Sequence, residues 1–396
     1  AEFDRLAALM DMNRSDLEAD IYCCLSEVHD ATEGFFAPNA VAAVQEQILD
    51  PEIMERWLTY PALRSERGAA VFERIKPAIV KRLAQAAKPQ EALLALDGFL
   101  QGLPAGVQLF SLFDANPQLV ELLVDIVSTS PALAQHLSRN ASVFDAVIGG
   151  DFFSEWIGQA SLQSDLREFL DRESDYEAKL DTARRWTKEL HFRIGVHLLR
   201  GLIDTKEAGV QYNDLARAVV GAIWPAVVEE FARRYGPPPG RGAVVLGMGS
   251  LGAGMLNTGS DLDLIVIYDP ANVDISQGPR QLATRSYYAR LTQAMITAVT
   301  VPMAQGRLYE VDMRLRPSGN QGPVATSWAS FQDYQRHNAW VWEHLALTRA
   351  DYVAGPNDLG QDIETFRRSI LNSPRDAKTV LAEVASTRAR IATARP

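Results

Sequence analysis

The stretch that decides the fold runs Leu246-Gly247-Met248-Gly249-Ser250 and continues, after ten intervening residues, as Asp261-Leu262-Asp263-Leu264. Its first half predicts a strand that ends in a Gly-Ser turn, and its second half predicts an apolar strand opened by Asp-x-Asp. Gly249 lets the backbone come close to a phosphate, and Ser250 offers a hydroxyl and an N–H to phosphate oxygens. Asp261 and Asp263, two residues apart, point to one face of a strand and together suit Mg²⁺ beside a triphosphate.

Length, charge and cysteines narrow the class of protein. The chain has 396 residues, 47% of them apolar, which predicts two or three well-packed domains. Its net charge of −11 and the lack of a basic run argue against nucleic acid as the main substrate, so a small nucleotide or a protein fits better. Adjacent Cys23 and Cys24 indicate a reducing compartment. No apolar run approaches 18 residues, so we expect a cytoplasmic protein without a membrane span or signal peptide.

Residues 1 to about 235 show the pattern of successive helices. Asn116-Pro117 predicts a helix start, because Asn is a good N-cap and Pro suits the first helical position. The core-facing stripe of that helix would be Leu119, Leu122, Leu123, Ile126 and Val127. Ser130-Pro131 predicts the next helix start. A longer helix is expected from about Asp214 to Tyr235, kinked at Pro225 and stopped by Gly236–Gly240.

Strand patterns begin only after this break. We expect strands at Ala243–Leu246 and Asp261–Tyr268, followed by a helix that carries Tyr288, Leu291, Met295 and Val299. A third strand, Leu308–Arg316, alternates almost perfectly. Its apolar face would hold Tyr309, Val311, Met313 and Leu315, and its polar face Glu310, Asp312, Arg314 and Arg316. From about Phe331 the pattern is helical again.

Asp312 is the candidate third acid. If its strand lies beside Asp261–Tyr268, three carboxylates converge on one edge, as two-metal nucleotidyl transfer requires. Arg314 and Arg316 would then flank the phosphates. The alternative interpretation is a set of solvated strand ends held in salt bridges.

A second interpretation of the turn is a dinucleotide-binding fingerprint, because Gly247-x-Gly249-x-x-Gly252 has that spacing and Asp269 follows a strand. That fold needs a crossover helix of at least about 10–12 residues between its strands. Only Ala253–Ser260 remains here, and it contains two glycines. We therefore reject this interpretation and expect Asp269 to be a strand-end cap or turn residue.

The interval from Gly-Ser to Asp-x-Asp resembles the nucleotidyltransferase superfamily signature, and three longer blocks resemble one family. They are VVLGMGSLGAGMLNTGSDLDLIVIYD, LYEVDMRLRPSGNQGPVATSWASFQDYQ and AWVWEHLALTRADYVAG. They are similar to glutamine synthetase adenylyltransferase, a bifunctional family with two related nucleotidyltransferase domains. In that family the amino-terminal domain removes AMP from glutamine synthetase and the carboxy-terminal domain attaches it. The helical segments at 65–84 and 112–137 resemble the region before the attaching domain.

The resemblance implies an α+β, mostly helical fold, in which a helical bundle region precedes a mixed sheet with helices and the start of a further helical region. The expected domains are a helical regulatory or linker region at 1–200, a catalytic domain at 201–355 and a truncated helical region at 356–396.

The resemblance also implies the chemistry. Asp261, Asp263 and Asp312 would be the catalytic, metal-holding acids, and Gly249 and Ser250 would lie on the ATP phosphates with Arg314 and Arg316 beside them. Mg²⁺, as two ions, is the implied cofactor and ATP the substrate. A tyrosine of glutamine synthetase would attack the α-phosphorus and release pyrophosphate, with Asp312 easing its proton away. The PII signalling protein and glutamine would be effectors, without nucleic acid or a membrane.

The sequence departs from the family pattern at the turn. The family has Gly-Lys-Leu-Gly-Gly where this chain has Gly249-Ser250-Leu251-Gly252-Ala253, and Glu-Leu in place of Met255-Leu256. The chain also resembles an excised fragment, without the removing half and the expected downstream segment. Two alternatives stay open: the AMP-removing domain, and a regulatory scaffold that binds nucleotide without catalysis.

Overall fold

A computed structural model describes residues 49–129, 133–134, 137, 151–303 and 306–394. The chain divides into two compact units, residues 1–149 and 150–396. The predicted helix start at Ser130-Pro131 lies outside the described residues. In the described ranges, none of the helices combines the length and the apolar character needed to cross a membrane.

The first unit is helical. Its elements are α4 (Pro51–Arg56), the 3₁₀ turns Trp57–Thr59 and Pro61–Leu63, α5 (Glu66–Ala84), α6 (Pro89–Gly102), α7 (Val107–Ala115) and α8 (Pro117–Thr129). α8 begins at the predicted proline, and the predicted stripe Leu119, Leu122, Leu123, Ile126 and Val127 is buried. Asp97 is buried because three side chains donate to it: Arg56 at 2.7 Å, Tyr60 at 2.8 Å and Trp57 at 3.2 Å.

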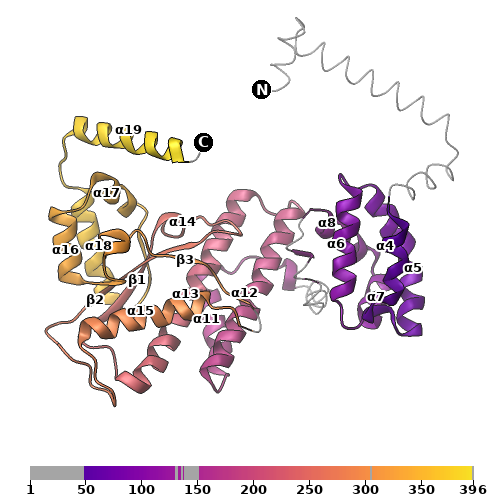
Figure 1. Cartoon of the computed structure of the whole chain (residues 1–396), viewed down its shortest axis with the longest axis horizontal. Coiled ribbons are helices and arrows are strands. Elements are labelled where there is room, and N and C mark those ends of the chain that lie inside the picture. The colour runs from indigo at the N-terminus through magenta and orange to yellow at the C-terminus, as the bar shows by residue number, and fades with distance from the viewer. Residues whose placement is uncertain (1–48, 130–132, 135–136, 138–150, 304–305, 395–396) are drawn as a thin grey trace, which may run out of the picture. The chain divides into compact units, whose positions relative to one another are not determined.

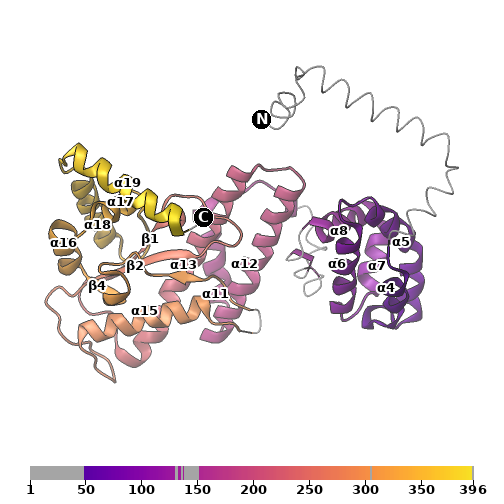
Figure 2. The ribbon, with the colours of Figure 1, turned by 45° about the horizontal axis from the view of Figure 1, so that its top comes forward.

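The second unit is built on a mixed sheet covered by helices on both faces (Figures 1 and 2). Its helices are α11 (Gly158–Asp171), α12 (Tyr176–Leu199), α13 (Thr205–Tyr235), α14 (Gly249–Gly252), α15 (Thr284–Thr300), α16 (Trp328–His337), α17 (Val341–Leu347), α18 (Asn357–Leu371) and α19 (Ala377–Ala394), with 3₁₀ turns at Asp151–Phe153 and Gly319–Gln321. Its strands are β1 (Gly242–Gly247), β2 (Leu262–Asp269), β3 (Val311–Asp312), β4 (Ala325–Ser327) and β5 (Asp351–Ala354). The α+β, mostly helical prediction is confirmed.

The strand order is β3-β2-β1-β5, with β4 also pairing with β2. β1 pairs antiparallel with β2 and with β5, whereas β3 and β4 run parallel to β2. An antiparallel β1–β2 pair is incompatible with a βαβ dinucleotide-binding unit, so rejecting that fingerprint is confirmed. Asp269 does act as a turn residue, since its Oδ1 accepts from the N–H of Ala271 at 3.0 Å.

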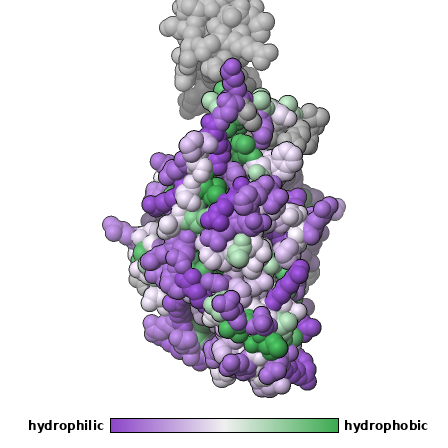
Figure 3. Space-filling view, turned by 90° about the vertical axis from the view of Figure 1, so that its left-hand side faces the viewer, coloured by the Kyte–Doolittle hydropathy of each residue, from purple (hydrophilic) through white to green (hydrophobic). Residues whose placement is uncertain are grey.

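Alternating side chains of the two central strands build two separate cores. Val245 and Val266 face a core formed with α11, α12, α13 and α15, while Val244 and Ile267 face a smaller core formed with α16, α17 and α18. The outer surface over α16 and α18 is mainly hydrophilic, with apolar side chains in small separate groups (Figure 3). The sheet is therefore the middle layer between two apolar cores.

Two predicted elements need correction. α13 begins at Thr205, nine residues before the expected start, because Asp204 caps it by accepting from Glu207 N–H at 2.7 Å. The predicted strand Leu308–Arg316 is reduced to Val311–Asp312. The N–H of Arg314 donates to Asp312 Oδ1 at 2.8 Å, so the chain turns directly after β3. Leu315 consequently packs against the smaller core and not beside Tyr309 and Met313.

A buried arginine fixes the segment that leads into β3. The Arg184 side chain is fully buried, and its guanidinium donates to backbone carbonyls. Its guanidinium donates to the carbonyls of Ala298 at 2.7 Å and Val301 at 2.9 Å, at the end of α15, and to that of Gly306 at 2.7 Å. These bonds satisfy the last carbonyls of the helix and hold the approach to Asp312 in place.

Candidate active site

The Gly-Ser turn lies directly against one of the predicted acids. β1 ends at Gly247, and Gly249 has a left-handed φ of 54°. A Cβ on Gly249 would collide with the carboxylate of Asp263, so a residue with a side chain does not fit there. The N–H of Met248 donates to the Asp263 carbonyl at 2.8 Å. The turn and the second strand therefore form one unit.

Asp263 and Asp312 occupy the same level of neighbouring strands. They are direct partners in the parallel β2–β3 pair, as are Leu262 and Val311. Parallel neighbours lie about 4.8 Å apart and point their side chains to the same face. Asp261 stands just before β2 and is exposed. The structure thus brings Asp263 and Asp312 together, with Asp261 at the entrance to the same edge.

The charges of these acids act on one another. Burial raises the pKa of Asp263, and the negative charges of Asp312 and Asp261 raise it further. The positive charges of Arg314 and Arg349 act in the opposite direction. A half-buried carboxylate with an upward-shifted pKa next to other acids is an arrangement that a cation or a phosphate-bound metal would stabilise.

Asp312 shows the opposite shift because Arg314 holds it. The Arg314 side chain donates from Nε to Asp312 Oδ2 at 2.7 Å, and its backbone N–H donates to Oδ1. These bonds, followed by the charges of Arg314 and Arg316, hold the pKa of Asp312 below its ordinary value. Both carboxylate oxygens are thus engaged, and Arg314, which was predicted on the phosphates, lies on an acid.

The other two predicted phosphate contacts differ in their surroundings. Ser250 follows Gly249 in the single turn of α14 and is half-buried. Arg316 donates to the carbonyls of Met313 at 2.7 Å and Gly322 at 3.3 Å, so its guanidinium closes its own loop. Its positive charge still reaches Asp312.

Sequence reasoning missed Arg349. This exposed residue precedes β5, and its positive charge lowers the pKa of Asp263. Its carbonyl oxygen occupies the space that a side chain on Gly252 would need. Since β5 joins β1 only in the folded sheet, spacing along the chain gives no sign that Arg349 belongs to the site.

The side chains at this edge of the sheet are of the chemical type that binds magnesium. Three carboxylates at one sheet edge supply the hard oxygen ligands that Mg²⁺ prefers. Within the described residues, however, no three His, Cys, Asp or Glu side chains are already gathered closely enough to hold a metal ion. Asp312 instead faces Arg314, so binding would require that ion pair to open.

A glycine turn against an acid strand, with a further acid on the parallel neighbour, is the arrangement that the sequence predicted for a nucleotidyltransferase site. The family model described as "Glutamate-ammonia ligase adenylyltransferase" matches residues 120–366. The chain therefore belongs to the glutamate-ammonia ligase adenylyltransferase family, as its motifs predicted.

Curated relatives agree with this family. Three proteins named "Bifunctional glutamine synthetase adenylyltransferase/adenylyl-removing enzyme" come from Brucella melitensis, Mesorhizobium japonicum and Agrobacterium fabrum. They are 44%, 42% and 40% identical to this chain over 338 residues, which is 85% of the chain and 34% of each relative. The chain thus spans about a third of the length of these relatives, whose shared name covers two activities.

Proposed function

We propose that this chain is the AMP-attaching part of the enzyme and transfers AMP from ATP to a tyrosine of glutamine synthetase. The observation that carries the proposal is the pairing of Asp263 with Asp312 directly beside the Gly249 turn. Membership of the family supports the nucleotidyl-transfer chemistry, and the named relatives support glutamine synthetase as the protein substrate.

In the proposed reaction the tyrosine oxygen attacks the α-phosphorus of ATP. The bond from the α-phosphorus to the bridging oxygen breaks, and pyrophosphate leaves with that electron pair. Asp312 is our candidate acceptor of the tyrosine proton. Arg314 keeps Asp312 a weak base at present, so we propose that Arg314 moves onto the phosphates and frees the carboxylate. Gly249 and Ser250 would lie against the phosphates, with Arg316 and Arg349 adding positive charge nearby.

We further propose that Asp261, Asp263 and Asp312 hold Mg²⁺, as two ions. The metal would neutralise charge on the phosphates while the acids position it. The upward-shifted pKa of Asp263 supports this, since clustered carboxylates gain from a bound cation. The chain departs from the family pattern at Ser250 and Ala253 in the turn. It nevertheless keeps all three of the acids that would hold the metal.

Organisation and regulation are part of the same proposal. Residues 1–200 would be a regulatory or linker region, 201–355 the catalytic domain and 356–396 the start of a further helical region. The PII signalling protein and glutamine would act as effectors, and the cytoplasm would be the compartment.

The second candidate function is removal of AMP by phosphorolysis. It is kept because the relatives carry both activities in their name and the chain spans about a third of their length. The two reactions run on similar scaffolds, so a direct assay must separate them.

The test uses glutamine synthetase, Mg²⁺ and ATP labelled at the α-phosphate, with the Asp261→Asn/Asp263→Asn double variant as the matched control. We expect label on the synthetase with the wild-type chain and none with the variant. Release of label from previously modified synthetase in phosphate would instead support the removing reaction. Nucleotide binding without either reaction would reduce the chain to a scaffold.

A further inference from the structure

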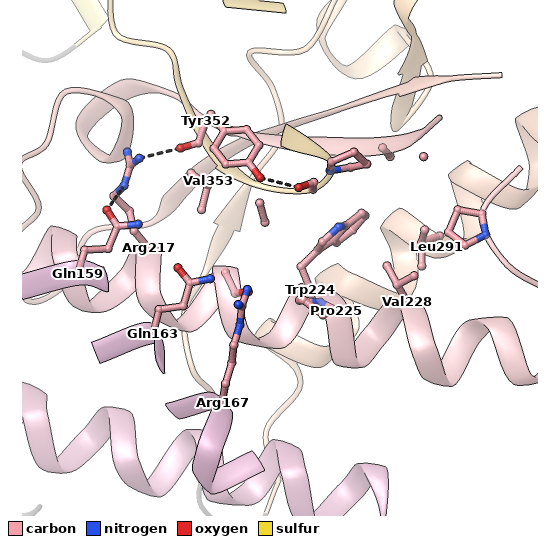
Figure 4. A pocket seen from close by; sticks show the side chains of 17 residues that line it. Gln159, Gln163, Arg167, Arg217, Trp224, Pro225, Val228, Leu291, Tyr352 and Val353 are labelled. Atoms are coloured by element: carbon pink, nitrogen blue, oxygen red, sulfur yellow. Dashed lines mark hydrogen bonds between the residues drawn. The ribbon is translucent and has the colours of Figure 1, made fainter. Parts of the chain in front are cut away.

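A cavity separate from the acids lies between α11, α13 and the sheet (Figure 4). Its volume of about 390 Å³ falls within the range of small-molecule sites. The start of β1 and the end of β5 line it, whereas Asp263, Asp312 and the Gly249 turn do not. The cavity therefore shares none of its lining residues with the candidate active site.

The charged side chains that line the cavity are positive, whereas the chain as a whole is negative. Although the chain carries −11, two arginines line the cavity and no Asp or Glu does. Arg217 is already satisfied, by Asp351 at 2.7 Å, the carbonyl of Tyr352 at 2.7 Å and Gln159 Oε1 at 2.9 Å. Arg167 is therefore the residue that gives the cavity its positive character.

A helix irregularity holds Arg167 at the cavity. Pro225 has no N–H, so the carbonyl of Gly221, four residues earlier in α13, lacks its helical donor. Arg167 Nη2 donates to that carbonyl at 3.0 Å. The proline predicted to kink this helix thus frees a carbonyl that Arg167 of α11 satisfies. Within the described residues the guanidinium makes no other hydrogen bond, so its remaining donors stay available to a ligand.

Gly221 also makes room for an amide. A Cβ at this position would come within 2.6 Å of Gln163 Nε2, so a larger residue would push the Gln163 amide away from α13. A glycine inside a helix costs about 1 kcal/mol relative to alanine, and the room it gives the Gln163 amide is a packing role for this one. In Figure 4, Gln163 and Arg167 extend from α11 on the same side of the cavity.

The opposite wall is apolar and aromatic. Trp224 faces the cavity from α13 opposite Tyr352 of β5 (Figure 4), and Val228, Leu291 and Val353 complete the wall. A single available guanidinium beside an amide suits one carboxylate better than a chain of phosphates. We propose that this cavity binds a small organic carboxylate with a flat apolar body, its acid group on Arg167 and Gln163 and its body on Trp224.

The test is ligand-detected saturation-transfer NMR on the whole chain, with benzoate as the probe and benzamide as its neutral counterpart. Two variants act independently: Arg167→Gln removes the charge, and Val228→Phe fills the apolar end. Arg172→Gln is the control, because Arg172 lies on the same region of chain after α11 and pairs with Glu168 outside the cavity. Thermal unfolding identifies any variant that fails to fold, and the other then carries the test.

We expect wild-type chain to bind benzoate with a dissociation constant of the order of 1 mM, as a small single-charge ligand should. Either cavity variant should weaken it at least about tenfold, while Arg172→Gln leaves it unchanged. Benzamide should bind at least about tenfold more weakly than benzoate. No benzoate binding at about 10 mM, equal binding of benzamide, or full affinity in both folded cavity variants would overturn the proposal.

Discussion

The two ends of the central strand pair each gather three aspartates, but among the described residues only one end joins all three to a single arginine by ion pairs. Where β1 begins, Arg241 lies among Asp269, Asp358 and Asp362, with the nearest contacts at 3.3, 2.9 and 2.7 Å. This holds the pKa of Asp358 below its ordinary value.

Where β1 ends, Arg314 binds Asp312 alone, and the pKa of Asp263 is raised. In the first cluster every aspartate is ion-paired with Arg241, whereas in the second, within the described residues, Asp261 and Asp263 have no ion pair and nearby arginines act on Asp263 only through their charge. We therefore expect the end with unpaired carboxylates, and not the ion-paired end, to bind a ligand.

The largest effect should come from removing the unsatisfied acid. Asp263→Asn should lower AMP transfer by about 10³-fold, because a residue that positions transition-state charge is lost. The matched control, Asp269→Asn at the opposite end, should retain most activity. Initial rates with labelled ATP measure both, and comparable losses would remove the distinction between the two ends.

The next effect separates backbone strain from the clash at the turn. Gly249 and Gly254 both have positive φ, at 54° and 80°, but only at Gly249 would a Cβ meet Asp263. Gly249→Ala should lower activity by about 10²-fold through displacement of the carboxylate. Gly254→Ala should introduce only backbone strain, of about 1–2 kcal/mol, because no atom lies close to the added Cβ. Its activity, measured below its melting temperature, should stay near wild type, and equal losses would refute the role of the close contact.

Arg349 tests whether the folded sheet adds a residue to the site. Arg349→Gln should lower kcat/KM for ATP by about tenfold or more, since one positive charge near the phosphates is lost. Arg368→Gln is the control, because Arg368 pairs with Glu364 on α18. Steady-state kinetics over a range of ATP concentrations checks this, and unchanged kinetics would exclude Arg349 from the site.

Removing Arg241 from its three ion pairs should lower the stability of the fold and leave the rate of AMP transfer unchanged. Arg241→Leu should lower the free energy of unfolding by about 1 kcal/mol, because partly exposed ion pairs contribute little and the acids then repel one another. AMP transfer should be retained. Chemical denaturation and initial rates at one temperature check this, and a tenfold activity loss without unfolding would show that the two ends are coupled.

The smallest effect is a pair of opposite pH dependences. A raised carboxyl pKa means that the contribution of Asp263 to stability is largest below about pH 4 and is lost as pH rises through the folded pKa. Asp263→Asn should therefore gain stability relative to wild type as pH rises.

Asp358 has a lowered pKa, so its stabilisation is present above about pH 4 and is lost as pH falls through the folded value. Asp358→Asn should therefore show a deficit at neutral pH that shrinks on acidification. Melting temperatures between pH 3 and 7 test both, and slopes of equal sign would contradict the comparison.

The sequence by itself determined the strand pair, the intervening turn and the family. These features could be predicted because they depend on interactions within a few residues: apolar runs, a positive-φ glycine and the period of two along a strand. It also excluded the dinucleotide-binding fold, because a gap too short for a crossover helix is visible in the chain. The acids Asp261, Asp263 and Asp312 were named on the same basis, and their catalytic role stays a prediction.

Only the tertiary structure decided which groups meet. The alternation at 308–316 predicted nine residues of strand. The strand instead ends at Asp312, because the Asp312 side chain accepts a hydrogen bond from the backbone N–H of Arg314. Arg349 comes near Asp263 because β5 pairs with β1, and Arg167 donates to Gly221 because Pro225 frees a carbonyl on another helix. The Asp312–Arg314 contact is local, whereas the last two bring together segments distant in sequence, so strand pairing and packing, and not local preference, fix them.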